Sequence, residues 1–488
     1  MIRTRFAPSP TGLLHVGGLR TALYQYLFAK NNGGKFLVRI EDTDRERTVE
    51  GGIQNILSSL YWAGVIPDEG VKLNEKGEMI QVGDFGPYIQ SERLEIYQKH
   101  AEFLIENKFA YHCFCTADRL DQIRHSQQEN KKPTGYDRFC LTNVSDEEAQ
   151  RRVAAGEKHV IRLKMPREGE TKFKDLIRGE VVFKNELVDD QVLIKSDGFP
   201  TYHLAVVVDD HFMQISHVIR GEEWISSTPK HIQLYKCFGW ELPVFAHLSL
   251  LLNSDKSKLS KRQGDVSVSE YEKNGYLPEA LVNFVAFLGW NPGGEREIFS
   301  LEELVKEFDL GKVNKTGAVF NLEKLDWFNK EYLKNLSAEE IFEKAGAWLT
   351  PEQKMNPEKT KKVIALEKDR IKNFSELSGS IKFLYELPEY SKELLIWKKS
   401  NLAEVQNILP QIKTVLSKIE EKEWSKLVVE QSVMSMVKEK GYNNGMVLWP
   451  LRVALSGQEN SPGPFEIAEV LGKTESQLRI EISLSKLA

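Results

Sequence analysis

Residues 2–44 read IRTRFAPSPTGLLHVGGLRTALYQYLFAKNNGGKFLVRIEDTD, and they carry the clearest structural pattern in the chain. Aromatic and β-branched residues within 2–7 predict a strand, which the proline-rich run 8–12 ends. Apolar residues then recur every three or four positions over 19–27, which predicts a helix, and the glycine pair 33–34 ends it. The segment therefore begins with a strand, a loop and a helix.

A second strand follows this helix. Phe36, Val38 and Ile40 alternate as in a strand, and residues 41–44, Glu-Asp-Thr-Asp, stand at its carboxyl end. Strand, loop, helix and strand make a βαβ unit, in which functional groups gather at the carboxyl edge of a parallel sheet.

The rest of the chain divides into a mixed part and a helical part. A mixed stretch from about Ser91 to Pro200, with short strands such as His159–Leu163, reads as an insertion into the sheet. Two more buried strands are predicted after it, at Leu204–Val208 and Ile215–Ile219, before a turn at 221–224.

Beyond residue 338 the apolar spacing becomes helical, over 371–384 and again over 405–419. Pro410 is expected to kink or break the second of these helices. We therefore expect an α/β N-terminal half, in which an α+β insertion interrupts a parallel sheet, and an all-α C-terminal half.

The composition is that of an ordinary globular protein. The 488 residues, 41% of them hydrophobic and 28% charged, exceed one compact core and suggest three to five structural units. Arg3 and Arg5 interrupt the first apolar residues, so no signal peptide is expected. The most apolar stretch, Leu277–Trp290, is too short to span a bilayer. Four cysteines make no disulfide framework, which favours a reducing, cytoplasmic setting.

The net charge of −5 does not itself indicate a nucleic-acid partner. A local basic groove is nevertheless enough to bind phosphates, so the composition leaves the function to the motifs.

The loop before the first helix can bind an anion. Free N–H groups and the positive end of the helix dipole favour a phosphate there, and Gly17 and Gly18 let a nucleotide approach the backbone. His15 can donate a hydrogen bond to phosphate oxygens. A purely structural turn is the alternative.

A cationic segment lies far downstream, where residues 256–262 read KSKLSKR between Asp255 and Gly264. Four cations and two hydroxyl groups suit a loop that closes on a polyphosphate, because nucleotidyl transfer depends on positioning and charge neutralisation. A solvated basic loop is the alternative.

Together these motifs resemble the two signatures of class I aminoacyl-tRNA synthetases. The segment 8–18, Pro-Ser-Pro-Thr-Gly-x-x-His-Val-Gly-Gly, is similar to the first signature in its glutamyl form, and 258–262 is similar to the second. The likeness to bacterial glutamyl-tRNA synthetases spans essentially the whole chain, through residues 39–44, 198–205, 219–224, 321–325 and 450–455.

The resemblance implies a division into domains. It assigns a Rossmann-like catalytic domain to 1–94 and 202–251, an inserted acceptor-end-binding domain to 95–201, a stem-contact domain with the lysine loop to 252–337, and helical anticodon-binding domains to 338–388 and 389–488.

The resemblance also implies the activity, which is ligation of L-glutamate to the 3′ end of tRNA(Glu). ATP with Mg²⁺ first forms glutamyl-adenylate and pyrophosphate, and transfer to tRNA then releases AMP. A monomer that engages no membrane is the expectation for this family.

Glutamate carries two carboxylates and one ammonium, so its pocket needs cations and an anion. Arg5 and Arg220 supply guanidinium groups that can grip a carboxylate, and Glu41 supplies the anion. By resemblance, Arg220 faces the side-chain carboxylate, which favours glutamate over glutamine. The same pocket would be lined by the Ala7 backbone, Ser9 and Tyr202.

For ATP, the resemblance implies that His15, Lys258 and Lys261 hold the phosphates and act catalytically, with Lys261 as the main group that stabilises the transition state. The implied nucleotide site is completed by Gly17, Gly18, Glu223, the Leu251 backbone, Leu259, Ser260 and Arg262. One position departs from the family, because Val206 stands where an asparagine is common, and any polar contact there would be lost.

The insertion contains a Cys-x-Cys pair that suggests a metal. By resemblance, zinc could bind Cys113, Cys115 and Cys140, with Tyr136 as fourth ligand because Thr142 replaces the usual histidine. Three thiolates and a phenol make an uncommon closed zinc site. His112 or His125 could be the fourth ligand instead, and reduced structural cysteines are the competing interpretation.

In the helical half, Arg370 and Arg452 fall where the family places arginines near anticodon bases, on which arginine can stack. A solvated helix face is the alternative. Three other functions compete with the main one: a truncated relative that glutamylates a tRNA base, a glutaminyl enzyme, and an inactive tRNA-binding paralogue.

Overall fold

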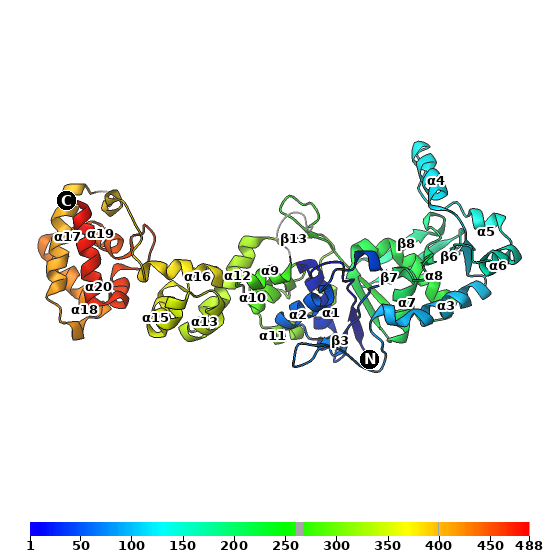
Figure 1. Ribbon diagram of the computed structural model, residues 1–488, viewed down its shortest axis with the longest axis horizontal. Coiled ribbons are helices and arrows are strands. Elements are labelled where there is room, and N and C mark those ends of the chain that lie inside the picture. The colour runs from blue at the N-terminus through cyan, green and yellow to red at the C-terminus, as the bar shows by residue number, and fades with distance from the viewer. Residues whose placement is uncertain (260–266, 399, 488) are drawn as a thin grey trace. The chain divides into compact units, whose positions relative to one another are not determined.

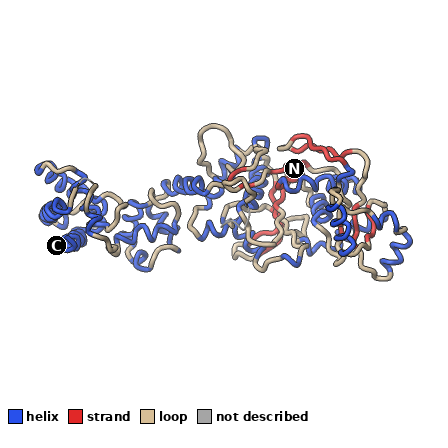
Figure 2. Tube along the Cα trace, turned by 90° about the horizontal axis from the view of Figure 1, so that it is seen from above, coloured by secondary structure: helices blue, strands red, loops and turns tan. Residues whose placement is uncertain are grey.

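The computed structural model describes residues 1–259, 267–398 and 400–487, and the chain divides into two compact units. The N-terminal unit comprises Met1–Glu272 and Pro278–Leu325, and the C-terminal unit comprises Lys273–Leu277 and Asp326–Ala488. Within the described ranges every strand belongs to the N-terminal unit, as the red segments in Figure 2 show.

The predicted βαβ unit is present at the N-terminus (Figure 1). β1 (Arg3–Phe6) leads through the proline-rich loop into α1 (Val16–Asn31), and the chain returns in β2 (Lys35–Val38), which pairs with β1 in parallel. A Cβ at Gly34 would lie 2.3 Å from the Ile2 carbonyl oxygen, so only glycine allows the chain to turn back here.

Four sheets occur in the described residues, with strand orders β1-β2-β3-β4, β10-β11-β7-β8, β5-β6-β9 and β12-β13. Their remaining strands are β3 (Glu69–Leu73), β4 (Met79–Val82), β5 (Ala110–Cys113), β6 (Val160–Leu163), β7 (Glu170–Asp175), β8 (Gly179–Lys184), β9 (Val192–Ile194), β10 (His217–Gly221), β11 (Val244–Leu248), β12 (Leu251–Leu252) and β13 (Ala318–Val319). β1, β2 and β3 are parallel, as are β10, β11 and β7. The predicted fold class is therefore confirmed.

The hairpin β7–β8 joins a sheet outside its own stretch of sequence. It falls inside the range 95–201 that the sequence assigned to the insertion, yet β7 pairs with β11, with Asp175 opposite Phe245. By contrast, β5, β6 and β9 pair only among themselves in the described chain, as expected for an inserted element. The stretch 95–201 thus contributes the β7–β8 hairpin to the sheet that also contains β10 and β11.

The helices of the N-terminal half are α2 (Gly52–Trp62), α3 (Leu94–Glu106), α4 (Ala117–Glu129), α5 (Phe139–Asn143), α6 (Asp146–Ala154), α7 (Tyr202–Phe212), α8 (Thr228–Phe238), α9 (Val268–Lys273), α10 (Pro278–Ala286), α11 (Leu301–Glu307) and α12 (Leu322–Lys334). None of the helices in the described ranges has both the length and the apolar content to cross a bilayer.

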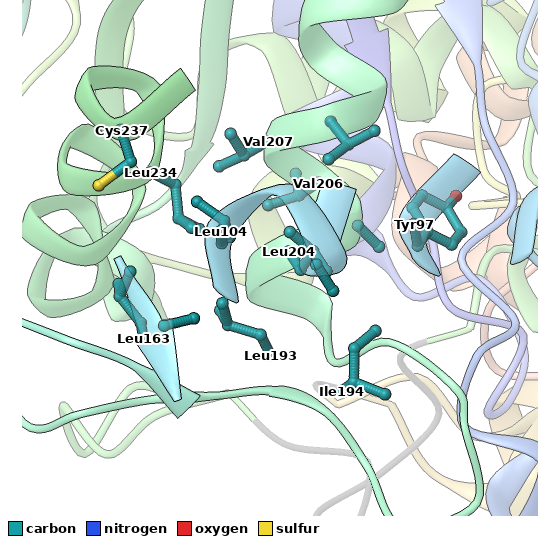
Figure 3. Close-up of a cluster of buried hydrophobic side chains, with 14 of the residues drawn as sticks. Tyr97, Leu104, Leu163, Leu193, Ile194, Leu204, Val206, Val207, Leu234 and Cys237 are labelled. Carbon is teal, nitrogen blue, oxygen red and sulfur yellow. The ribbon is translucent and has the colours of Figure 1, made fainter. Parts of the chain in front are cut away.

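The strand predicted at Leu204–Val208 is wrong, because these residues belong to helix α7. All five are buried, since α7 packs against α3, α8 and β9 in one apolar core (Figure 3). A helix buried on every side has no polar face, and its short apolar run cannot be distinguished from a buried strand by spacing. Val206 lies within this core, 2% exposed, and does not line the active-site pocket, so the valine at this position removes no polar group from the pocket lining.

The C-terminal unit consists of helices in its described part. It contains most of α12 and, after it, α13 (Ala338–Lys344), α14 (Pro351–Met355), α15 (Pro357–Glu367), α16 (Phe374–Ile381), α17 (Leu402–Ser417), α18 (Lys426–Lys440), α19 (Asn444–Ser456) and α20 (Pro464–Leu487). α17 runs through Pro410 without interruption. Pro410 and Gln406, whose carbonyl loses its helical partner, are both exposed, so water can satisfy that carbonyl.

Candidate active site

A pocket of about 1020 Å³ opens at the carboxyl ends of β1, β2 and β10. Ten residues predicted from the sequence line it, namely Arg5, Ala7, Ser9, His15, Gly17, Gly18, Glu41, Tyr202, Arg220 and Glu223. They come from four separate stretches of chain, as expected at the edge of a doubly wound sheet.

The predicted lysine loop is described only in part. Lys258 and Leu259 are described but lie outside the pocket, as does Leu251. Ser260, Lys261 and Arg262 belong to 260–266, which is outside the described residues. The described residues on either side of this gap contact residues predicted for the nucleotide site. Leu259 N–H donates to Leu251 O (2.9 Å), and Ser267 forms an isolated antiparallel β-bridge with His15.

His15 caps helix α1. Its Nδ1 accepts hydrogen bonds from the N–H groups of Gly17 (3.0 Å) and Gly18 (3.2 Å). Two donors on Nδ1 require that this nitrogen carries no proton, so the proton resides on Nε2. The cap therefore fixes the tautomer in which Nε2 can donate to an anion.

Gly17 and Gly18 also meet a steric requirement that was not predicted from the sequence. A Cβ at Gly17 would lie 2.9 Å from His15 Cε1, and one at Gly18 would lie 2.8 Å from Leu14 Cδ1. The glycine pair therefore makes room for the capping imidazole and for the core, in addition to leaving the backbone open.

Arg5 is held in a buried ion-pair cluster. Its Nε and Nη2 donate to the two carboxylate oxygens of Asp210, at 2.9 and 3.2 Å. Arg39 joins Asp210 (2.8 Å) to Glu41 (3.0 Å), and Arg39 and Asp210 are less than 4% exposed. Burial raises the pKa of the Asp210 carboxyl, but nearby cations, Arg5 first among them, lower it below its ordinary value. The charge of Arg5 is therefore compensated by that carboxylate.

Glu41 is the anion that the pocket offers to an ammonium group. Burial raises the pKa of its carboxyl to about 6, although the guanidinium of Arg39 acts in the opposite direction. A cation bound beside Glu41 would favour the charged form, because it restores compensation for a desolvated carboxylate.

Arg220 differs from Arg5 in having no acidic partner among the described residues. It is 5% exposed, and its donors go to neutral groups: His247 Nε2 (3.1 Å), Tyr202 Oη (3.0 Å), His231 Nδ1 (3.2 Å), Thr228 Oγ1 (2.9 Å) and Trp224 O (3.4 Å). Burial is the first cause that lowers the pKa of both histidines, so they stay neutral at neutral pH. A buried cation without a counter-charge is costly, and a carboxylate ligand would remove that cost.

The wall beside Arg220 is aromatic. Tyr202, the first residue of α7, lies with its ring centroid 4.2 Å from that of Trp224. Glu223 stands next to it in the 3-10 helix η4 (Glu222–Ser227), exposed at the pocket wall. The pocket therefore combines a cationic end, an aromatic wall and a carboxylate at the opening.

Several groups that shape the site were not predicted from the sequence. They are Asp210, His231, His247, Thr228 and Lys195, the last of which lines the pocket and donates to Thr43 O (3.2 Å). Asp210 carried a signal, because an acidic pair within an apolar run implies buried partners for its charges. The others carried none, since isolated histidines and lysines are common on surfaces.

The cysteine cluster predicted from the sequence is assembled. The Sγ atoms of Cys113, Cys115 and Cys140 lie within 4.8 Å of one another, and Tyr136 Oη lies 3.3 Å from Cys113 Sγ and 3.4 Å from Cys115 Sγ. Ligand atoms around a tetrahedral zinc are about 3.8 Å apart for Zn–S bonds of about 2.3 Å, so these four donors need little movement.

The surroundings of this cluster favour one thiolate, at Cys113, while the hydrogen bond shared with Cys113 raises the pKa of the Cys140 thiol. Hydrogen bonding from Cys140 lowers the pKa of the Cys113 thiol to about 4 against the effect of burial, and Arg119 Nη1 donates to Cys115 Sγ (3.3 Å). In the described chain neither His112 nor His125 joins the cluster. Tyr136 is therefore the fourth donor that the fold brings into place.

The two arginines predicted near the anticodon lie in the C-terminal unit. Arg370 Nε is 3.3 Å from Glu367 Oε2, with 41% of the Arg370 side chain exposed. The Arg452 guanidinium lies 4.6 Å from the Trp449 ring centroid. Burial, followed by the charge of Arg370, lowers the pKa of Arg452, so the two guanidinium groups are close enough to influence each other.

Comparisons with known proteins cover the whole chain. Residues 1–327 match the family described as tRNA synthetases class I (E and Q), catalytic domain, and residues 340–484 match the anticodon binding domain family. The chain is 48% identical to the glutamate–tRNA ligase of Chloroherpeton thalassium, over 100% of this chain and 98% of the relative. It is 46% identical to that of Finegoldia magna, over 99% of each. Among solved structures, a glutamate tRNA ligase from Elizabethkingia meningosepticum in complex with its amino acid matches with a TM-score of 0.89 and 38% identity over 100% of both chains.

Proposed function

The chain belongs to the class I tRNA synthetases for glutamate and glutamine, and from this membership we infer that it ligates L-glutamate to the 3′ end of tRNA(Glu). ATP is the energy source, and Mg²⁺ neutralises phosphate charge when it accompanies ATP. The anticodon-binding match also distinguishes the chain from truncated relatives that lack this part.

The observation that carries the choice of glutamate is the charge of Arg220. Arg5 is neutralised by Asp210, whereas Arg220 is buried among neutral acceptors. A carboxylate pairs with such a guanidinium and an amide does not, so glutamine would leave the charge uncompensated. In this proposal Arg220 receives the side-chain carboxylate, and Tyr202 lines the same end of the pocket.

The remaining contacts orient the amino acid. Glu41, with Ser9 and the Ala7 backbone nearby, faces the ammonium group, while Arg5 lies on the side of the α-carboxylate. An α-carboxylate oxygen attacks the α-phosphorus of ATP, a P–O bond forms, and the bond to the bridging oxygen of pyrophosphate breaks. A terminal ribose hydroxyl of tRNA then attacks the activated carbonyl carbon, and AMP leaves. Neither step needs a side-chain nucleophile.

Nucleotide contacts are proposed for other residues of the pocket. His15 Nε2–H would donate to phosphate oxygens, supported by the tautomer that its capping role fixes. Glu223 is proposed to bind the adenosine, together with the Leu251 backbone. Lys258 and Lys261 are proposed to neutralise the charge of the leaving pyrophosphate. For Lys261 this proposal rests on the sequence alone.

We also propose a structural zinc ion held by Cys113, Cys115, Cys140 and Tyr136, which is supported by the convergence of these four donors. The zinc would stiffen the segment 95–201, which we propose binds the acceptor end of tRNA. A cytoplasmic monomer is part of the same proposal and fits the four unpaired cysteines.

For tRNA selection, we propose that the helical domains 338–388 and 389–488 bind the anticodon. Arg370 and Arg452 are the residues proposed to contact its bases, supported by the exposure of Arg370 and by the stacking of Arg452 on Trp449.

The test is parallel aminoacylation of purified tRNA(Glu) and tRNA(Gln) with glutamate and with glutamine. Pyrophosphate exchange that depends on glutamate should accompany it, measured with and without tRNA. Charging of tRNA(Glu) with glutamate is expected, and charging with glutamine alone would contradict the proposal.

A further inference from the structure

A hydrogen-bonded chain behind the substrate pocket leads from Arg220 to a buried carboxylate. Arg220 Nε–H donates to His247 Nε2 (3.1 Å), and His247 Nδ1–H donates to Asp175 Oδ2 (2.6 Å). His247 and Asp175 are at most 1% exposed. Neither residue lines the pocket, so neither touches a substrate directly.

The geometry of Asp175 fixes which nitrogen of His247 is protonated. Asp175 Oδ1 accepts from the backbone N–H groups of Ile177 (2.9 Å) and Arg178 (2.8 Å), and this holds the carboxylate in place. Its other oxygen accepts from Nδ1, which leaves Nε2 of His247 unprotonated. Nε2 is then an acceptor that can hold the guanidinium of Arg220.

We propose that Asp175 and His247 are a positioning pair that fixes Arg220 for the side-chain carboxylate and thereby sets the preference for glutamate over glutamine. A carboxylate in direct contact with Arg220 would neutralise it, as Asp210 neutralises Arg5. An imidazole placed between the two charges orients the guanidinium and leaves its charge available to the ligand.

A second histidine acts in the same way on the other side of Arg220. His231 Nδ1 accepts from Arg220 Nη1 (3.2 Å), and its Nε2 lies 3.1 Å from His203 Nδ1. Arg220 is thus held between two imidazoles, each of which accepts from one of its N–H groups. The link to Asp175 is made by the β7–β8 hairpin, which pairs with β11 beside the pocket.

This inference rests on the proposed function, and Asp175→Asn tests it with little change in shape. The asparagine Oδ1 can keep these two backbone hydrogen bonds and the longer one from His247 N–H (3.3 Å), which directs its NH₂ group at His247 Nδ1. His247 must then carry its proton on Nε2, where it opposes Arg220 Nε–H. Arg220 loses an acceptor while the fold keeps its contacts.

The readout is tRNA-dependent pyrophosphate exchange with glutamate or glutamine varied. Asp175→Asn should raise the KM for glutamate about tenfold or more, and lower the ratio of kcat/KM for glutamate to that for glutamine by a similar factor. The kcat at saturating glutamate and the KM for ATP should each change less than about threefold, because no catalytic group is touched.

A second pair of variants keeps the test decisive if Asp175→Asn does not fold. His247→Leu removes the acceptor and should raise the KM for glutamate, whereas His247→Gln offers a side-chain oxygen near the position of Nε2 and should restore most of the affinity. His217→Leu and His217→Gln are the matched controls, since His217 is on the same strand as Arg220 but bonds to Ser216.

An unchanged KM in folded Asp175→Asn or His247→Leu protein, or a fall in kcat alone, would overturn the inference. If the wild-type protein charges no tRNA with glutamate, the proposed function fails instead. The two failures are therefore distinguishable in one set of assays.

Discussion

Arg5 and Arg220 were both predicted to bind carboxylates, and their surroundings predict opposite effects of mutation on stability. Arg220→Gln removes a buried charge that has no acidic partner in the described structure. Arg5→Gln removes one partner of a bidentate ion pair with Asp210, whose carboxylate then keeps only Arg39 at 2.8 Å. Both variants should lose activity, but only one should lose stability.

The magnitudes follow from these contacts. Loss of one partner of a buried, hydrogen-bonded ion pair costs about 3–5 kcal/mol, and the remaining Arg39 places Arg5→Gln near about 3 kcal/mol. Arg220→Gln should leave the free energy of unfolding of the free protein within about 1 kcal/mol or raise it, because a desolvated charge is removed. Its loss of about 2–5 kcal/mol in binding the substrate carboxylate corresponds to a fall of about 30-fold to a few thousandfold in kcat/KM for glutamate.

The assay combines tRNA-dependent pyrophosphate exchange with urea unfolding of each variant without ligands. Arg220→Gln should also narrow the gap between glutamate and glutamine as substrates. The reasoning is refuted if Arg220→Gln is destabilised as much as Arg5→Gln, or if it keeps kcat/KM for glutamate within about threefold of the wild type.

Three further predictions concern the rest of the site. Gly17→Ala should displace the capping ring of His15 and lower the rate of pyrophosphate exchange by about tenfold or more, although alanine normally favours a helix by about 1 kcal/mol. An exchange rate within about threefold of the wild type would contradict this. Protein purified without chelator or nickel resin should contain one zinc per chain by elemental analysis, and Cys140→Ser should lose it; no zinc in the wild type would refute the site. Because the pKa of Glu41 is raised to about 6, its carboxylate is lost as the pH falls through that value, so the KM for glutamate should rise about tenfold per pH unit below pH 6, and a flat profile would exclude this role.

The strands and the helix of the N-terminal βαβ unit could be predicted because the sequence patterns that specify them each span only a few residues. The strand, helix and strand of residues 2–44 occur as β1, α1 and β2, since alternation, helical spacing and glycine placement act within a few residues. The same method failed at Leu204–Val208, where burial on every side removed the periodicity that separates a helix from a strand.

The residues that line the candidate site could be predicted from the sequence, whereas the buried residues that hold them in place could not. Arg5, Glu41 and Arg220 lie within recognisable motifs, and the fold brings all three to one pocket. Asp175 and His247 lie 72 residues apart, and no pattern in the sequence links them. Their hydrogen bond forms because β7 pairs with β11, and this strand pairing is seen only in the folded sheet.

The sequence by itself therefore determined the family and the reaction, and it predicted the residues proposed for the site, because these lie in short motifs with fixed spacing. For the proposed zinc site the sequence predicted three cysteines in a recognisable pattern and left the fourth donor open, and the fold brings Tyr136 to them. Only the tertiary structure decided the charge state of the pocket. A guanidinium is the same group in Arg5 and in Arg220, but the first faces Asp210 and the second faces neutral imidazoles. Electrostatic energy depends on distance and burial, and both are set by which strands and helices lie side by side.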